Sequence, residues 1–228
     1  MSRAHLSLLC SLLLLPSGSI AQSENNASAK KNLAECVVAT MPREAHDAVF
    51  STLIDRRFNK KFGDLMRKKC YIQSASASAS ANTVHSANAL RSALASSLVR
   101  ANYSQSGPLD FSKVPALWHI QSTKPSGVGG GHRNERDFAL KESASRRFLS
   151  IYGECIAREK PEPVRQFLLT PEGSKDEAKL FAILQPSLSS CLNKDVSLQL
   201  DQSLVRESLA YNYYRLAAVE IPVGQGTE

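Results

Sequence analysis

Apolar residues recur at helical spacing along most of this chain. In 56–66 they fall at i, i+4, i+7 and i+8, and comparable stripes occur in 90–98, 180–184 and 204–216. Alternation of apolar and polar residues, which would indicate strands, is sparse. The pattern therefore predicts an all-α protein.

An internal repeat organises these helices. Glu35 and Cys36 recur as Glu154 and Cys155 at an offset of 119 residues. Each copy then continues with a proline, a second cysteine and an arginine within an apolar motif: Pro42, Cys70 and Arg91 in the first copy, and Pro161 or Pro163, Cys191 and Arg206 in the second. Four landmarks in one order indicate a duplication.

We therefore expect two tandem helical repeats of about four helices each, at 33–103 and 147–219. A copy of about 70 residues would be marginal alone, which favours one domain with pseudo-twofold symmetry. Two separate lobes are the alternative. The glycine- and proline-rich residues 104–146 are expected to form a crossover linker, and 220–228 a flexible tail. The expected anchors of the crossover in the core are Leu109, Phe111, Val114, Leu117 and Trp118.

The N-terminus has the layout of a secretory signal peptide. Arg3 precedes an apolar run of about ten residues, and Ser19 and Ala21 supply the small residues of a cleavage site. A membrane anchor would need roughly 20 apolar residues. We expect 1–21 to be removed and 22–32 to be a flexible lead-in. The mature chain would then be periplasmic or secreted, with no transmembrane span.

Four cysteines remain after cleavage, in a compartment that favours disulfides. Of the three possible connectivities, the repeat selects Cys36–Cys70 and Cys155–Cys191. A zinc site would need closely spaced cysteine pairs, and a redox enzyme would need C-x-x-C or an activated thiol. The chain has no such spacing, so structural disulfides are favoured.

The repeat also doubles a pair of opposite charges. Glu35 and Glu154 each precede the first cysteine of their copy, while Arg91 and Arg206 occupy its last helix. We expect equivalent ion pairs, Glu35–Arg91 and Glu154–Arg206, to join the first and last helices. Four solvated surface charges are the alternative.

Positive charge is concentrated in one segment. The chain has 28 Lys and Arg against 21 Asp and Glu, a net charge of +7. Seven of the bases lie within 56–69: Arg56, Arg57, Lys60, Lys61, Arg67, Lys68 and Lys69. The corresponding part of the second copy is balanced in charge, so the fold does not require these bases. They are candidates for contact with an anionic envelope surface or a polyanion, although a merely solvated face is the alternative.

No motif of a known catalytic, cofactor or metal site is present. We therefore assign no catalytic, cofactor-binding or metal-ligating residue, and no cofactor. His119 and His132 are expected to be ordinary loop histidines, the alternative being a Ser/His or metal site built from the crossover. Tyr211, Tyr213 and Tyr214 are expected to pack at the end of the last helix rather than form an aromatic ligand platform.

Two function classes stay open. The first is a non-catalytic exported helical protein that binds a partner or contacts an envelope surface. The second is an exported hydrolase whose site is assembled from crossover loops. A cleft that gathers His119, His132 and a serine or carboxylate would favour the enzyme, whereas a basic surface without convergent polar groups would favour the binding module.

The doubled arrangement of Glu-Cys-Val-Val, a distal cysteine and Leu-Arg-x-x-Leu-Ala after a signal peptide resembles a group of uncharacterised exported proteins of alphaproteobacteria, sphingomonads in particular. The resemblance covers 33–103 and 147–218. It implies a bacterial host and a periplasmic or secreted location. It carries over no activity and no functional residue.

Overall fold

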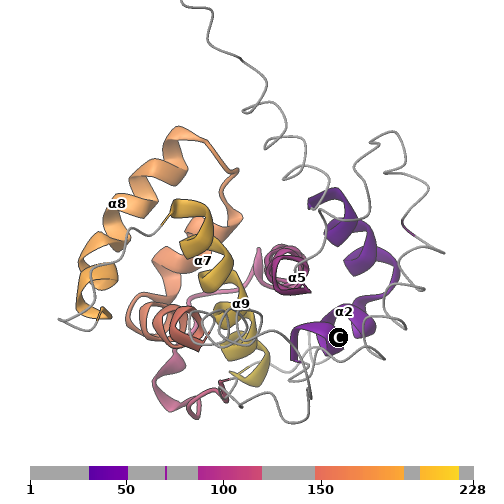
Figure 1. The fold of residues 1–228 in the computed structure, drawn as a ribbon, viewed down its shortest axis with the longest axis horizontal. Coiled ribbons are helices and arrows are strands. Elements are labelled where there is room, and N and C mark those ends of the chain that lie inside the picture. Colours follow the sequence, from indigo (N-terminus) through magenta and orange to yellow (C-terminus); the bar gives the residue numbers. More distant parts are fainter. Residues whose placement is uncertain (1–30, 51–69, 71–86, 120–146, 193–200, 221–228) are drawn as a thin grey trace, which may run out of the picture.

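A computed structural model describes residues 31–50, 70, 87–119, 147–192 and 201–220 (Figure 1). Within these ranges the chain forms seven α-helices and a single turn of 3-10 helix, and no strand. The expected all-α class is therefore confirmed. The signal peptide 1–21 and the seven bases of 56–69 lie outside the described residues.

The described part of the N-terminal half starts with helical residues 31–40, followed by α2 (Pro42–Phe50). Proline starts α2 because it lacks the N–H that a first helical turn leaves unbonded anyway. The N–H of Met41 donates to the Val37 carbonyl at 2.7 Å, so the two helices meet without a loop. A disulfide, with 5.7 Å between the Cα atoms, joins Cys36 to Cys70 as predicted.

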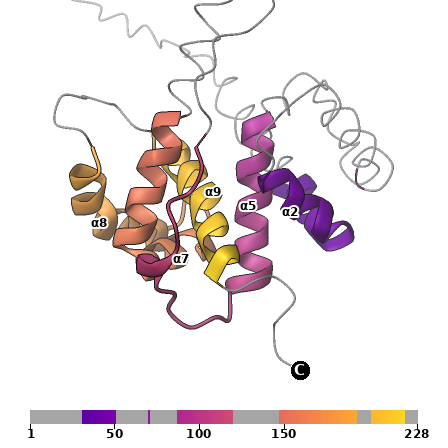
Figure 2. The same ribbon diagram turned by 90° about the horizontal axis from the view of Figure 1, so that it is seen from below.

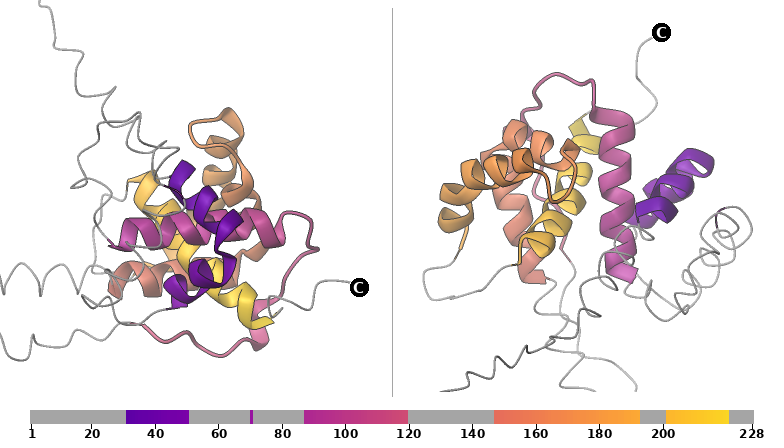
Figure 3. Two further views of the ribbon diagram at one scale, coloured as in Figure 1. Left: turned by 90° about the vertical axis from the view of Figure 1, so that its right-hand side faces the viewer. Right: turned by 90° about the horizontal axis from the view of Figure 1, so that it is seen from above.

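Two long helices form the centre of the fold, α5 (Ala87–Tyr103) and α9 (Gln202–Glu220). Among the labelled elements they make the most extensive contact, and α5 also packs against α2. Figure 2 shows α5 between α2 on one side and α9 on the other, and Figure 3 shows α2 crossing α5. Leu94 and Leu98 are buried in α5 and Leu209 and Leu216 in α9. The predicted apolar stripes of these two packed helices are therefore largely buried, but Leu204, at the start of the second stripe, is 40% exposed, and Ile183, in the stripe predicted over 180–184, is 54% exposed.

The C-terminal half contains a helix over 147–159, α7 (Pro161–Leu169) and α8 (Lys175–Ser190). Ser174 caps α8 by accepting the Glu177 N–H at 3.1 Å. The Glu177 carboxylate reaches back to the N–H of Gly173, whose φ of 75° suits only glycine well. A second disulfide, with 5.9 Å between the Cα atoms, joins Cys155 to Cys191, again as predicted.

Some described positions that lie 119 residues apart have similar surroundings. Both α2 and α7 are nine residues long. Val37 is fully buried, and so is Ile156, which stands 119 residues later. The bond from Met41 to Val37 has its counterpart at the same offset, from the Lys160 N–H to the Ile156 carbonyl at 2.9 Å. Each half thus joins its first two helices in the same way.

The start of the crossover runs along the C-terminal half. Its 3-10 turn η1 (Phe111–Lys113) buries Phe111, and Leu109 and Val114 are buried on either side. Leu117 is partly buried against the core. Trp118 was expected to be an anchor, but this is wrong: it is 50% exposed.

Candidate functional site

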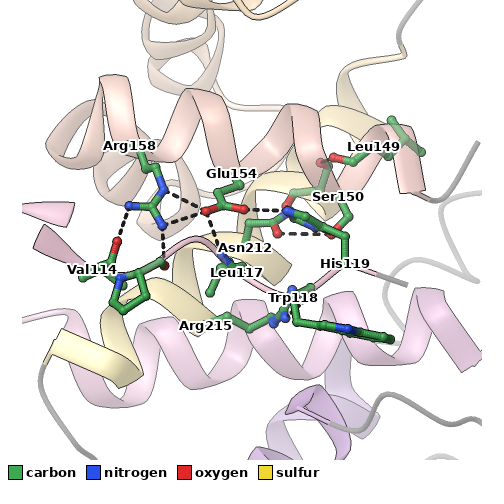
Figure 4. Close-up of polar contacts among 12 residues, drawn as sticks. Val114, Leu117, Trp118, His119, Leu149, Ser150, Glu154, Arg158, Asn212 and Arg215 are labelled. Carbon is green, nitrogen blue, oxygen red and sulfur yellow. Dashed lines mark hydrogen bonds and ion pairs between the residues drawn. The ribbon is translucent and has the colours of Figure 1, made fainter. Parts of the chain in front are cut away.

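A cluster of polar side chains fastens residues 111–119 to the helix over 147–159 (Figure 4). Arg158 is at its centre. Its Nη1 donates to the carbonyls of Phe111 at 2.7 Å and Val114 at 2.8 Å, and its Nη2 to that of Pro115 at 2.7 Å. Its Nε donates to Glu154 at 2.8 Å. A single guanidinium therefore satisfies three carbonyls of a segment that has no regular partner strand or helix.

Glu154 is the second centre of the cluster. It is buried, yet its carboxylate accepts bonds from Arg158, from the Leu117 N–H at 3.0 Å and from His119 Nε2 at 2.6 Å. Burial alone raises the pKa of this carboxyl, but the bonds from His119, Leu117 and Arg158 and the charge of Arg158 outweigh it. They lower the pKa to about 2 from an ordinary value of 4.5. Glu154 is therefore ionised at neutral pH.

His119 connects this carboxylate to a serine. Its Nδ1 lies 2.8 Å from the Ser150 Oγ, and Ser150 is four residues before Glu154 on the same helix. That spacing places both side chains on one helix face. Ser150 also donates to the Asn212 Oδ1 at 3.3 Å. Figure 4 shows His119 lying across Ser150 and Glu154, with Asn212 of α9 behind them.

A serine, a histidine and a carboxylate connected by successive hydrogen bonds are the groups that can activate a serine as a nucleophile. The direction of each bond decides what they can do. The amide of Asn212 is oriented by its own bond to the Ser208 carbonyl at 2.8 Å, which leaves Oδ1 facing Ser150. When Ser150 donates its only hydroxyl proton to Asn212, its oxygen can only accept from His119, so Nδ1 must carry a proton. To act as a base toward Ser150, His119 would instead need an unprotonated Nδ1, with its proton on Nε2 facing Glu154.

The predicted ion pairs Glu35–Arg91 and Glu154–Arg206 are wrong. All four residues are described, and each has other partners. Glu35 lies 4.0 Å from Lys31 and 3.9 Å from Arg100, while Glu154 pairs with Arg158 and His119.

The two arginines bind instead at the ends of the second helix of each half. Arg91 Nε donates to the Ala48 carbonyl at 3.2 Å, and Arg206 Nη2 to the carbonyls of Leu168 and Thr170 at 3.0 and 2.6 Å. The last carbonyls of a helix receive no hydrogen bond from an N–H of the same helix, and they carry partial negative charge, so they attract a cation. The prediction considered only acidic side chains as partners of the arginines, and backbone carbonyls at a helix end do not differ from others in the sequence.

Sequence reasoning named His119 but missed Ser150 and the clamp through Arg158. The four-residue spacing from Ser150 to Glu154 was a usable signal for a shared face, although nothing in it points to a histidine 31 residues before Ser150. His132 and the bases Arg56, Arg57, Lys60, Lys61, Arg67, Lys68 and Lys69 lie outside the described residues. His46, in α2, is bound to the Tyr214 hydroxyl of α9 at 2.8 Å. Tyr213 and Tyr214 are buried, whereas Tyr211 is only partly buried.

The described residues contain no group of three or more His, Cys, Asp or Glu side chains placed to hold a metal ion. None of their helices has the length and apolar character needed to cross a membrane. The two disulfides are typical of a chain that folds in an oxidising compartment.

Comparison with known proteins returned no matching family model, no matching curated protein and no matching solved structure.

Proposed function

We propose that the chain is an exported, non-catalytic binding module that contacts an anionic envelope surface or polyanion. The observation that carries the proposal is the distribution of charge. The described ranges contain thirteen basic and thirteen acidic residues, so the helical framework is balanced. The whole net charge of +7 therefore comes from other residues, with seven bases in 56–69. Such a surplus attracts an anionic partner.

The polar cluster at His119 supports a framework role for that region. Glu154 and Arg158 both bind backbone groups of the crossover, and Ser150 is bonded on two sides. The cluster is thus accounted for as a clamp between two parts of the chain.

A tandem duplication is part of the same proposal. It is supported by the equal lengths of α2 and α7 and by the two disulfides, which span 34 and 36 residues. It is supported further by Arg91 and Arg206, each of which binds a carbonyl near the end of the second helix of its half. The bacterial host and the periplasmic or secreted location belong to this proposal as well.

Co-sedimentation with lipid vesicles tests the binding function. The mature oxidised chain is mixed with vesicles of phosphatidylglycerol and phosphatidylcholine, or of phosphatidylcholine alone, at low and high salt. We expect retention only on the anionic vesicles and its loss at high salt. Changing the seven bases of 56–69 to glutamine should weaken retention at least tenfold, since each base near such a surface contributes about 1 kcal/mol.

A matched variant removes the same charge from the framework. It changes the seven exposed bases of the described ranges to glutamine: Lys31, Arg43, Lys113, Arg147, Lys160, Lys175 and Lys179. We expect it to keep most of the retention. Equal losses in both variants, or a wild type indifferent to anionic vesicles, would contradict the proposal.

An exported hydrolase is the second candidate, and the contacts of His119 with Ser150 and Glu154 favour it. A fluorophosphonate probe, which reacts with activated serines, should then label the mature chain. Labelling should disappear in Ser150→Ala and persist in Ser112→Ala, which removes an exposed hydroxyl from η1. A wild type that is neither labelled nor able to hydrolyse simple esters excludes this candidate.

A further inference from the structure

Four arginines form two pairs at opposite ends of the central helices α5 and α9. Arg91, early in α5, lies near Arg215, late in α9; Arg206, early in α9, lies near Arg100, late in α5. The two helices therefore run in opposite directions, and the pairs occupy corresponding places. Burial lowers the pKa of both Arg91 and Arg206, and the charge of the neighbouring arginine lowers each further.

One of these pairs is neutralised by carboxylates. Arg206 contacts Glu177 at 2.7 Å, and both side chains are only 6% exposed. Glu172 lies 3.3 Å from the same arginine, and Glu35 lies 3.9 Å from Arg100. Acidic groups thus compensate the buried positive charge at this end of α5 and α9.

The other pair has no such compensation within the described residues. Arg91 and Arg215 are 5% and 6% exposed, and no described carboxylate forms an ion pair with either. Among the described residues, Arg91 donates to the Ala48 carbonyl and also interacts with Tyr211, and Arg215 donates to the Trp118 carbonyl at 2.6 Å. The buried Nη2 of Arg91 and the buried Nε and Nη1 of Arg215 have no hydrogen-bond partner. Buried charges of this kind are costly unless they are paired.

Both guanidinium groups lie over the same aromatic ring. The Cζ of Arg215 is 4.9 Å, and that of Arg91 5.7 Å, from the centroid of Tyr211. Tyr211 is partly exposed, so it forms an edge of the arrangement that solvent reaches. The ring attracts two cations but supplies only a fraction of the energy of a charge pair.

The sequence shows why the two ends differ. Glu177 stands 14 residues before Cys191, and the residue 14 before Cys70 is Arg56. Where the second half provides a carboxylate for its arginine, the first half has a basic segment. Within the described residues, no carboxylate takes the place at Arg91 that Glu177 has at Arg206.

From these contacts we infer that Arg91, Arg215 and Tyr211 form a binding site for a small phosphate-class oxyanion, which takes the role that the Glu177 carboxylate has at Arg206. Guanidinium groups with free N–H donors are the groups that proteins use for phosphate and sulfate. Two positive charges match the charge of inorganic phosphate near neutral pH. The site is separate from the proposed surface contact and does not depend on it.

Calorimetry and thermal unfolding of the mature oxidised chain test this site. Inorganic phosphate is titrated against sodium chloride at equal ionic strength, which cancels general screening. We expect saturable binding, and at tenfold excess over Kd a rise of about 3–5 °C in the unfolding midpoint. Failure of the wild type to bind phosphate more tightly than chloride overturns the inference.

Four glutamine variants locate the effect. Arg91→Gln and Arg215→Gln should each weaken phosphate binding at least tenfold, whereas Arg206→Gln and Arg100→Gln should retain it. Arg215→Gln serves as the main variant if loss of the Arg91 bond to α2 prevents folding, which circular dichroism reports. Equal losses in all four variants overturn the inference.

The source of the anion is distinguished by a second arm. Anionic vesicles should not compete with inorganic phosphate for this buried site, and the variant neutralised in 56–69 should lose vesicle retention but keep phosphate binding. Competition by vesicles would overturn the assignment to a small free ion. Absence of vesicle retention would therefore contradict the proposed surface contact without affecting the phosphate site. Absence of phosphate binding would contradict this site without affecting the surface contact.

Discussion

Glu154 provides a quantitative test of the clamp that holds the crossover. Its carboxyl is buried among His119, Leu117 and Arg158, and its pKa in the folded chain falls to about 2 from an ordinary 4.5. A group whose pKa is lower in the folded state contributes stability above its unfolded pKa and loses it as pH falls toward the folded value. The stability that Glu154 contributes should therefore be complete above about pH 5 and nearly gone at pH 2.

The magnitude follows from the same two values. Each tenfold change in proton affinity corresponds to about 1.4 kcal/mol, so a fall from 4.5 to about 2 corresponds to about 3 kcal/mol. Glu154→Gln has nearly the same shape but no charge. The variant should thus be less stable than the wild type by about 3 kcal/mol at pH 7, and this difference should shrink toward zero at pH 2.

Urea unfolding of the oxidised chain, followed by circular dichroism between pH 2 and pH 7, measures this difference. Glu159→Gln is the matched control, because Glu159 is on the same helix but exposed, and its pKa is lowered by bonds from Ser190 and Ser187. It should give a smaller change with pH. A difference between wild type and Glu154→Gln that stays constant across this range would refute the reasoning, because the carboxylate would then not be the group that titrates.

Three further substitutions probe the framework. Gly153→Ala should destabilise the chain by about 2 kcal/mol or more in urea unfolding, because the added Cβ would lie 2.3 Å from a side-chain oxygen of α9, whereas Gly107→Ala, in open space, should be nearly neutral. Ser174→Ala removes the cap of α8 and should cost about 1 kcal/mol in the same assay, and an unchanged midpoint would contradict the cap. The double variant Cys155→Ser, Cys191→Ser should lower the free energy of unfolding by about 3 kcal/mol, which calorimetry would measure as a lower unfolding midpoint. An unchanged midpoint would show that the disulfide does not stabilise the fold.

The features that were predictable from sequence are those with a local or repeated signal. The proline starts of α2 and α7 follow from the chemistry of proline, and the repeat alone selects the disulfide pairing among three choices. The central stripes of α5 and α9 follow from helical spacing.

The remaining features depend on contacts between residues that are distant in sequence. Trp118 is apolar but exposed because its neighbours Leu117 and His119 face the 147–159 helix, and alternate side chains of an extended segment point to opposite sides. Arg91 and Arg206 bind backbone carbonyls, which every residue carries, so no pattern of side chains could reveal them. The meeting of His119 with Ser150 requires the path of the crossover.

The position of α5 and α9 side by side at the centre has a consequence for how this chain can be divided. Helix α5 of the first half packs against α9 of the second, so the described part of the core is shared between the two halves. A break at Gly107, an exposed residue, would yield two fragments that are insoluble or unfolded apart and that recombine when mixed. Each fragment would then fold only in the presence of the other.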